Sequence, residues 1–193
     1  MTREQAWAWL CEWVQSESLR RHALAVEAAM RRYAARFGGD ADVWGLAGLL
    51  HDLDYERFPE PPAHTREAAR FLRERGVDEE IVGAILSHAR WNWEEYPLDR
   101  PIRRALFAVD ELCGFLMAVA YVRPERLEGL QPSSVRKKLK QKSFAAGVSR
   151  EDIEQGAACL GLPLDEHIAE VTAALQQVAA ELGLANRAAG SAG

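Results

Sequence analysis

The chain has few cysteines and few histidines, and its three cysteines form no motif. Cys11, Cys113 and Cys159 are odd in number, widely spaced and outside any CxxC pair in a chain of 193 residues. A disulfide framework or a zinc site built from cysteine pairs would require a different pattern. We therefore predict that these are reduced core residues of a cytoplasmic protein.

The sequence also shows neither the pattern typical of a secretory leader nor a long uninterrupted apolar run. Its N-terminus, MTREQAWAW, does not pair a basic stretch with an apolar one, so we expect no signal peptide. The longest apolar run, 105–122, is interrupted by Asp110 and Glu111. Lipid would not readily accept that acidic pair, whereas a buried helix that carries a functional site would.

A basic surplus is absent as well, because the formal net charge is −5. Proteins that bind nucleic-acid polymers or membrane surfaces usually carry a positive excess, so we expect neither partner. A small anionic substrate is compatible with this charge if a metal ion supplies positive charge locally. The 48% hydrophobic and 27% charged residues are ordinary for a soluble globular protein.

What is present is helical periodicity over nearly the whole chain. Capping residues, glycines and prolines punctuate it. The predicted helices are 2–14, 19–37, 40–51, 65–75, 79–89, 101–121, a short basic helix within 133–144, 149–161 and 165–182. No strand pattern, repeat or linker interrupts them. We predict an all-α fold, a compact helical bundle forming a single domain over 1–184, with a ligand-bearing core at 18–122, C-terminal helices at 133–182 and a disordered tail at 185–193.

Four of the five histidines and two aspartates follow one another in a particular order on these helices. The order is His22, His51-Asp52, His64, His88, Asp110. The helix positions of His22, His51, His88 and Asp110 place each of them beside apolar or small residues, so these side chains should point inward.

Each polar residue also has an individual structural interpretation. A single histidine can be a hydrogen-bonded core residue, Asp52 can cap a helix end, and Asp110 can pair with Arg103 or Arg104. These separate explanations would all have to hold at once, whereas one shared metal centre accounts for all six residues. We therefore favour the metal centre. The fifth histidine, His167, is expected to be a surface or core residue.

The order H…HD…H…H…D on consecutive helices resembles the HD-domain superfamily of metal-dependent phosphohydrolases over residues 18–122. The resemblance implies that His22, His51, Asp52 and Asp110 hold a first metal ion. It also implies that Asp52 bridges to a second ion held by His64 and His88, with His51 and Asp52 at the catalytic centre. The chain departs from the family where it reads HDLD in place of HDIG or HDxxK, which leaves subfamily-specific roles of that loop open.

The cofactor expected from this donor set is one or two divalent transition-metal ions. Histidine-rich ligation with a bridging carboxylate favours iron or manganese, with magnesium, cobalt and nickel as alternatives. Such ions would activate a water for attack on phosphorus. Asp54, Asp99 and Glu111 are candidate hydrogen-bond partners for the ligands, although Asp99 also fits a solvated surface position.

Two segments are candidates for substrate binding. Arg90, Trp91 and Trp93 follow His88 directly, so a nucleobase could stack there with a guanidinium on its phosphate, or the tryptophans could cover the edge of the core. The basic run Arg136, Lys137, Lys138, Lys140, Lys142 could bind phosphates or form a solvated face. We name Arg90, Trp91, Lys137 and Lys140 as the substrate-binding candidates.

The predicted activity is hydrolysis of a small phosphate ester, with a nucleotide or dinucleotide as the favoured substrate. Two alternatives of other classes remain: a mixed-valent diiron oxygenase with the same ligand order, and a non-catalytic module that senses a nucleotide or metal. The sequence leaves the substrate and the oligomeric state open, and an oligomer is compatible with it.

Overall fold

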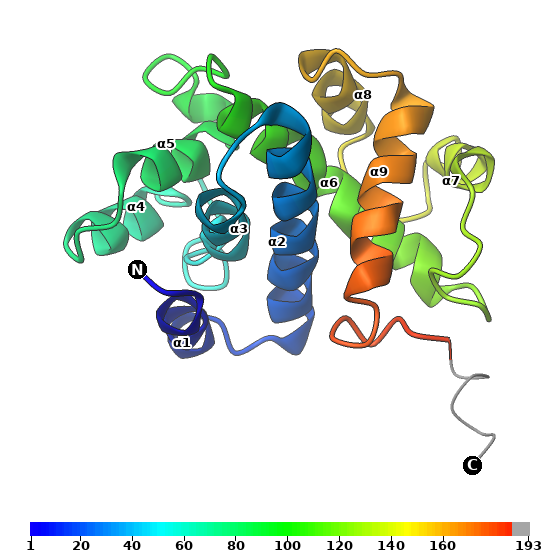
Figure 1. Cartoon of the computed structure of the whole chain (residues 1–193), viewed down its shortest axis with the longest axis horizontal. Helices are drawn as coiled ribbons and strands as arrows, with labels where there is room; N and C mark the ends of the chain where they lie inside the picture. Colours follow the sequence, from blue (N-terminus) through cyan, green and yellow to red (C-terminus); the bar gives the residue numbers. More distant parts are fainter. Residues whose placement is uncertain (187–193) are drawn as a thin grey trace.

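The computed structural model describes residues 1–186, and these residues form helices joined by turns, with no strand among them (Figure 1). The predicted all-α fold is therefore confirmed. The elements are α1 (Arg3–Trp13), α2 (Glu17–Phe37), α3 (Ala41–Leu50), α4 (Arg66–Arg73), α5 (Glu79–Ser87), the 3₁₀-helix η1 (Arg90–Asn92), α6 (Pro101–Tyr121), α7 (Pro132–Leu139), α8 (Arg150–Cys159) and α9 (Leu164–Gln177). Apart from its first two residues, the predicted tail lies outside the described part of the chain.

Helix starts follow the predicted capping chemistry. Thr2 and Gln5 form a reciprocal capping box at the start of α1. The Asp40 side chain accepts hydrogen bonds from the first free amides of α3, and Ser149 accepts one from Asp152 N at the start of α8. Pro101 occupies the first turn of α6, where its missing N–H costs no hydrogen bond. These local signals fix where the helices that carry the site begin.

Two helices differ from their predicted bounds by more than two residues. The last helix stops at Gln177 rather than at 182, because Val178 and Ala179 donate to carbonyls three residues back and the chain continues as turns. The basic helix begins at Pro132 and ends at Leu139, so Lys140 is its C-cap and Lys142 lies beyond it.

Helix α3 lies against α2 with little space between the backbones. A Cβ atom on Gly48 of α3 would lie 2.9 Å from the carbonyl oxygen of Val26 and 3.0 Å from Cα of Glu27, both on α2. Helix α8 approaches α6 in the same way, since a Cβ on Gly156 would lie 2.6 Å from Cα of Ala108. Small residues at these points allow backbone approach that a side chain would prevent.

The buried core is continuous from the N-terminal helices to the C-terminal ones. Helices α2 and α9 lie side by side across α6 (Figure 1), and all three contact one another. His167 of α9 is buried within this core: its Nε2–H donates to Ala108 O (2.9 Å), so its Nδ1 accepts from the Tyr33 hydroxyl (2.6 Å). The C-terminal third therefore stabilises the helices that carry the candidate ligands.

The cysteines require a partial correction. All three are free thiols, and Cys113 is buried as predicted. Cys11 and Cys159 are half-buried rather than core residues, because they lie on the less covered sides of α1 and α8. In the described residues, every helix is too short or too polar to cross a membrane.

Candidate metal centre

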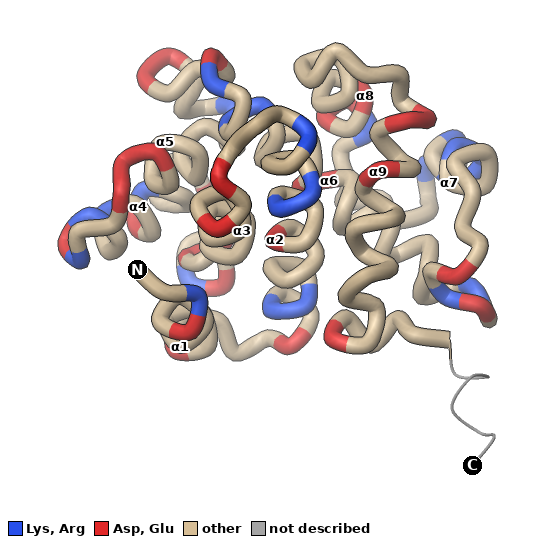
Figure 2. Tube along the Cα trace, viewed as in Figure 1, with Lys and Arg blue, Asp and Glu red and all other residues tan. Residues whose placement is uncertain are grey.

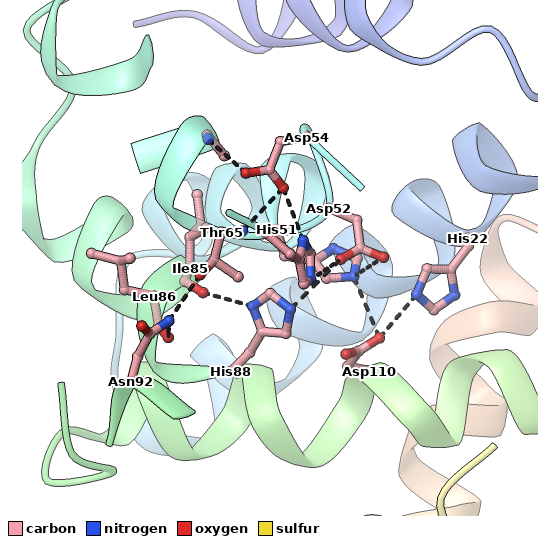
Figure 3. A network of polar contacts seen from close by, with 12 residues as sticks. His22, His51, Asp52, Asp54, Thr65, Ile85, Leu86, His88, Asn92 and Asp110 are labelled. Carbon is pink, nitrogen blue, oxygen red and sulfur yellow. Dashed lines mark hydrogen bonds and ion pairs between the residues drawn. The ribbon is translucent and has the colours of Figure 1, made fainter. Parts of the chain in front are cut away.

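The candidate ligands come from five separate parts of the chain and converge on one point (Figure 3). His22 lies on α2 and Asp110 on α6, while His51 and His88 are the C-cap residues of α3 and α5. Asp52 follows His51 directly. The sixth residue, His64, belongs to the turn before α4. The structure therefore brings together all six residues that the sequence singles out.

His51 and His88 are oriented by the same local device. Each ring hydrogen-bonds through Nδ1 to the carbonyl three residues earlier in its own helix, His51 to Gly48 O (2.8 Å) and His88 to Ile85 O (2.6 Å). A carbonyl only accepts, so Nδ1 must carry the hydrogen in both rings. The Nε2 atom of each ring is then left with a lone pair that points into the site.

His64 is oriented in the same sense by a carboxylate. Its Nδ1 lies 2.9 Å from Oδ1 of Asp54, a fully buried aspartate. Asp54 also accepts hydrogen bonds from Thr65 N (3.1 Å) and Ala68 N (2.7 Å), which ties the turn to the start of α4. The predicted role of Asp54 as a partner of a histidine is confirmed. A carboxylate behind a ligating imidazole is a common support in metal sites.

Asp52 lies between the two groups of histidines. Its Oδ2 is 3.4 Å from His51 Nε2, and its Oδ1 is 3.4 Å from His64 Nε2 and 3.6 Å from His88 Nε2. Two groups have ligand atoms close enough to hold an ion: His22, His51 and Asp52, and Asp52, His64 and His88. Asp52 is common to both groups, which is the arrangement expected of a carboxylate that bridges two ions.

Asp110 lies beside the first group. Its Oδ1 lies 2.9 Å from His22 Nε2 and 3.4 Å from His51 Nε2. It pairs with these histidines rather than with Arg103 or Arg104, and Arg103 instead pairs with Asp99 at 3.1 Å. Asp99 therefore lies at the surface pairing with an arginine, and its alternative role as a partner of the ligands is not seen.

The charge balance of the site favours a cation. Burial lowers the pKa of His51, but the carboxylates of Asp52 and Asp110 outweigh it and raise that pKa well above its ordinary value. Burial likewise raises the pKa of Asp52 and Asp110, and the facing His51 outweighs it, so both carboxyls have lowered pKa values. A proton on His51 and a metal ion are thus alternative ways to neutralise the two carboxylates.

The surroundings of His51 Nε2 indicate that the donor set fits a metal ion. His51 Nε2 is buried and makes no hydrogen bond within the described chain, although two carboxylate oxygens lie 3.4 Å away. A buried polar atom without a partner is costly, and an imidazole lone pair facing carboxylates is a usual setting for a divalent transition metal. The residues present therefore fit a metal ion.

A cavity of about 470 Å³ opens in front of the ligands. Three aromatic side chains are among the residues that line it: Tyr55, Trp91 and Phe107. Trp91 is 45% exposed, and its ring centroid lies 5.9 Å from that of His64. A planar group entering the cavity would meet this exposed ring near the metal ligands.

Arg90 lines the cavity but is held by neighbours. Its Nε donates to Oδ1 of Asp152 on α8 (2.6 Å) and its Nη2 to Gln155 Oε1 (2.6 Å). Trp93 does not line the cavity: its Nε1–H donates to Ser87 O (2.8 Å) and its ring packs against Phe107. Trp93 therefore covers the edge of the core, which is one of the two roles that the sequence suggested for the tryptophans. Trp91 is exposed and can contact a ligand.

Three further residues that the sequence suggested for the site have positions or contacts other than those expected. Lys137 and Lys140 are on α7 and its C-cap, and neither lines this cavity. Glu111 does line it, but its carboxylate accepts from Ser149 N (3.0 Å), and no histidine of the described chain lies in hydrogen-bonding contact with it. Burial, with the negative charge of Asp110, raises the pKa of Glu111 to about 7.

The sequence-based prediction missed Tyr55 and Asp152. Tyr55 follows the HDLD segment and packs edge-on to His64, with ring centroids 5.2 Å apart. Tyr55 lies exposed in a proline-containing turn, where hydrophobic periodicity gives no indication of side-chain direction. Its closeness to Asp52 in the chain could have indicated that it lies near the site. Asp152 was not among the site candidates, and its contact with Arg90 spans 62 residues.

Comparison with known families agrees with this geometry. A sequence model of the HD domain matches residues 19–131, which is more than half of the chain. The chain belongs to the HD domain family. Proteins of this family are in general metal-dependent phosphohydrolases. Searches of curated proteins and of solved structures returned no match.

Proposed function

We propose that this HD-domain protein is a hydrolase of a small phosphate ester, with a nucleotide or dinucleotide as the favoured substrate. The single observation that carries the proposal is the buried, unpartnered Nε2 of His51 between the carboxylates of Asp52 and Asp110. The family match supports the reaction class, and the cavity supports a small-molecule substrate.

In this proposal, His22, His51, Asp52 and Asp110 hold one divalent ion, and Asp52, His64 and His88 hold a second. The bound ions supply a Lewis acid that neutralises phosphate charge and lowers the pKa of a water. Iron or manganese is favoured by the histidine-rich donor set, over magnesium, cobalt or nickel. The protein's own contribution is orientation, because the Nδ1 contacts of His51, His64 and His88 fix which ring nitrogen faces the ions.

Substrate contacts are assigned to the cavity wall. We propose that Trp91 stacks on a planar base and that Arg90 hydrogen-bonds a phosphate oxygen from its tethered position beside Asp152. Holding the guanidinium in place before binding reduces the entropy lost when substrate is bound. We also propose that the protein acts in the cytoplasm, a location that its three free cysteines support.

The first test is elemental analysis of the full chain purified without added metal, followed by a panel of phosphatase and phosphodiesterase substrates. Asp52→Ala should lose both metals and all hydrolysis, because Asp52 belongs to both ligand groups. His64→Ala should lose chiefly the second metal. Asp42→Asn, at an exposed aspartate on α3 whose carboxylate pairs with Arg31, is the matched control and should keep its metal content.

Three outcomes would overturn the proposal. One is full metal content together with hydrolysis in Asp52→Ala. Another is oxygen consumption with an organic substrate and no phosphate release, which would select the mixed-valent diiron oxygenase. The third is nucleotide binding without turnover that is unchanged in His51→Ala and Asp52→Ala, which would select a sensing module.

A further inference from the structure

The distribution of lysine in this chain is uneven. Of its 24 basic residues, 20 are arginines and only four are lysines. All four lysines fall within six consecutive positions: Lys137, Lys138, Lys140 and Lys142. Figure 2 shows this basic stretch on α7, on the side of the molecule away from α1. Lysine is therefore concentrated at one place in a chain that otherwise uses arginine.

Two of these lysines line a second cavity, of about 480 Å³. We call it the basic cavity. Its charged wall residues are four bases and one acid, namely Arg136, Lys140, Lys142, Arg150 and Glu154. This local excess of positive charge contrasts with the net charge of −5 for the whole chain. The field in such a hollow attracts an anion.

The lysines of the basic cavity pair with no acidic residue of the described chain. In the described residues, no carboxylate oxygen lies within 4.0 Å of Lys140 or Lys142, whereas Arg136 reaches Asp165 at 3.3 Å. Basic residues in the last turn of a helix are explained by the negative end of its dipole, which accounts for Arg136, Lys137 and Lys138. Lys142 lies past the end of α7, so that explanation does not extend to it.

The basic cavity and the metal-site cavity share a wall at residues 146–148. Ala146 lines the basic cavity, Gly147 lines the metal-site cavity, and Val148 lines both. Arg150 fixes this wall by donating to Ala145 O (2.6 Å) and Val148 O (2.7 Å). The Nε of Arg150 is buried and finds no acceptor within the described chain. The segment 146–148, which Arg150 holds in place, thus separates two adjacent cavities. One is lined by candidate metal ligands, and the other is lined by Lys140 and Lys142, which pair with no carboxylate of the described chain.

We propose that the basic cavity binds a phosphate group of a small molecule, through Lys140 and Lys142. Lysine ammonium groups are compact point charges that suit phosphate oxygens, and their free side chains can turn toward a bound anion. The phosphate has two sources: the distal end of a substrate bound at the metal centre, or a separate phosphate compound that affects turnover. The first source rests on the proposed function, and the second needs only the basic cavity.

The binding test uses the full chain after treatment with a chelator and desalting, so that metal ions contribute nothing. Isothermal titration calorimetry with inorganic tripolyphosphate should give one saturable site whose affinity falls with salt. Lys140→Gln and Lys142→Gln should each raise the Kd about three- to tenfold, the loss expected for one charge-assisted contact at an exposed site. Arg100→Gln removes one charge from an exposed residue outside both cavities, and it should keep the Kd within about twofold.

Turnover then separates the two sources. If the phosphate is the distal end of the substrate, Lys140→Gln should raise the ratio of KM for ATP to KM for p-nitrophenyl phosphate about three- to tenfold. If it belongs to a separate compound, tripolyphosphate should change p-nitrophenyl phosphate hydrolysis less in Lys140→Gln than in the wild type. Absence of saturable binding, or equal weakening in both lysine variants and Arg100→Gln, would overturn the basic cavity as a phosphate site. Binding without any hydrolysis would overturn only the proposed function.

Discussion

Replacing Asp54 with asparagine tests whether a buried carboxylate fixes His64 as a ligand. The substitution keeps the size of the side chain and removes its charge. In the wild type, Oδ1 accepts from His64 Nδ1 (2.9 Å) and Thr65 N (3.1 Å), and Oδ2 accepts from Ala68 N (2.7 Å). An asparagine has only one acceptor oxygen for these three donors. Its NH₂ group must therefore face an N–H donor in either orientation.

The expected loss of stability follows from the number of hydrogen bonds that the asparagine cannot accept. If the amide oxygen takes the Oδ1 position, the NH₂ group faces Ala68 N and one bond to a charged group is lost. Such bonds contribute about 1.5–3 kcal/mol, and a buried donor left unpaired costs about 1–3 kcal/mol. We expect Asp54→Asn to lower the free energy of unfolding by about 2–4 kcal/mol. Loss of the carboxylate behind His64 should also weaken the second metal by about 10–100-fold.

The assay compares the two metals in one protein. Manganese is titrated into chelator-treated wild type and Asp54→Asn and followed by electron paramagnetic resonance, while urea denaturation gives the free energy of unfolding. The first metal should bind with nearly unchanged affinity, because no ligand of that group contacts Asp54 in the described chain. Equal weakening of both metals, or of neither, would refute the assignment of Asp54 to His64 alone.

Three further predictions concern packing, the cavity wall and pH. Gly48→Ala should lower the free energy of unfolding by about 1–3 kcal/mol in urea denaturation, since its Cβ would lie 2.9 Å from the backbone oxygen of Val26; an unchanged midpoint would contradict that close approach. Trp91→Ala should leave stability within about 0.5 kcal/mol and raise KM for a nucleotide but not for glycerol phosphate, with equal effects on both arguing against stacking. Burial lowers the pKa of His167 from 6.5 to about 4, so the unfolded state binds more protons between these values and stability falls as pH drops from 6.5 to 4. That loss, up to about 3 kcal/mol, should be absent in His167→Gln if His167 is its source.

The helices that carry strong local signals were predictable from sequence. Thr2 with Gln5, Asp40 and Pro101 mark helix starts through backbone chemistry that depends on neighbouring residues alone. The end of α9 was not predictable in the same way. Its sequence stays periodic to 182, but the backbone after Gln177 tightens into turns that bury Leu182 and Leu184 against the core. Tertiary packing decided that boundary.

The ligand order was visible in the sequence because His22, His51, His88 and Asp110 lie within or at the end of helices, beside apolar or small residues. The partners of the ligands were only partly visible. Asp54 was named as a candidate, but nothing in the spacing indicates that one carboxylate serves His64, Thr65 and Ala68 together. Arg90 was predicted to contact a substrate phosphate, and its tether to Asp152 depends on how α8 packs on α6. Contacts across many residues require the fold.

The two proposed metal positions differ in what holds their ligands. His51 and His88 are fixed by backbone carbonyls of their own helices, which no side-chain substitution removes. His64 is instead fixed through Nδ1 by the carboxylate of Asp54, a residue outside the candidate ligand set, and this contact also makes its imidazole a stronger donor. The first position additionally draws on Asp110 of α6, a helix packed on several others. We therefore expect the first metal to depend on the fold as a whole, and the second to respond to single substitutions in the turn around Asp54.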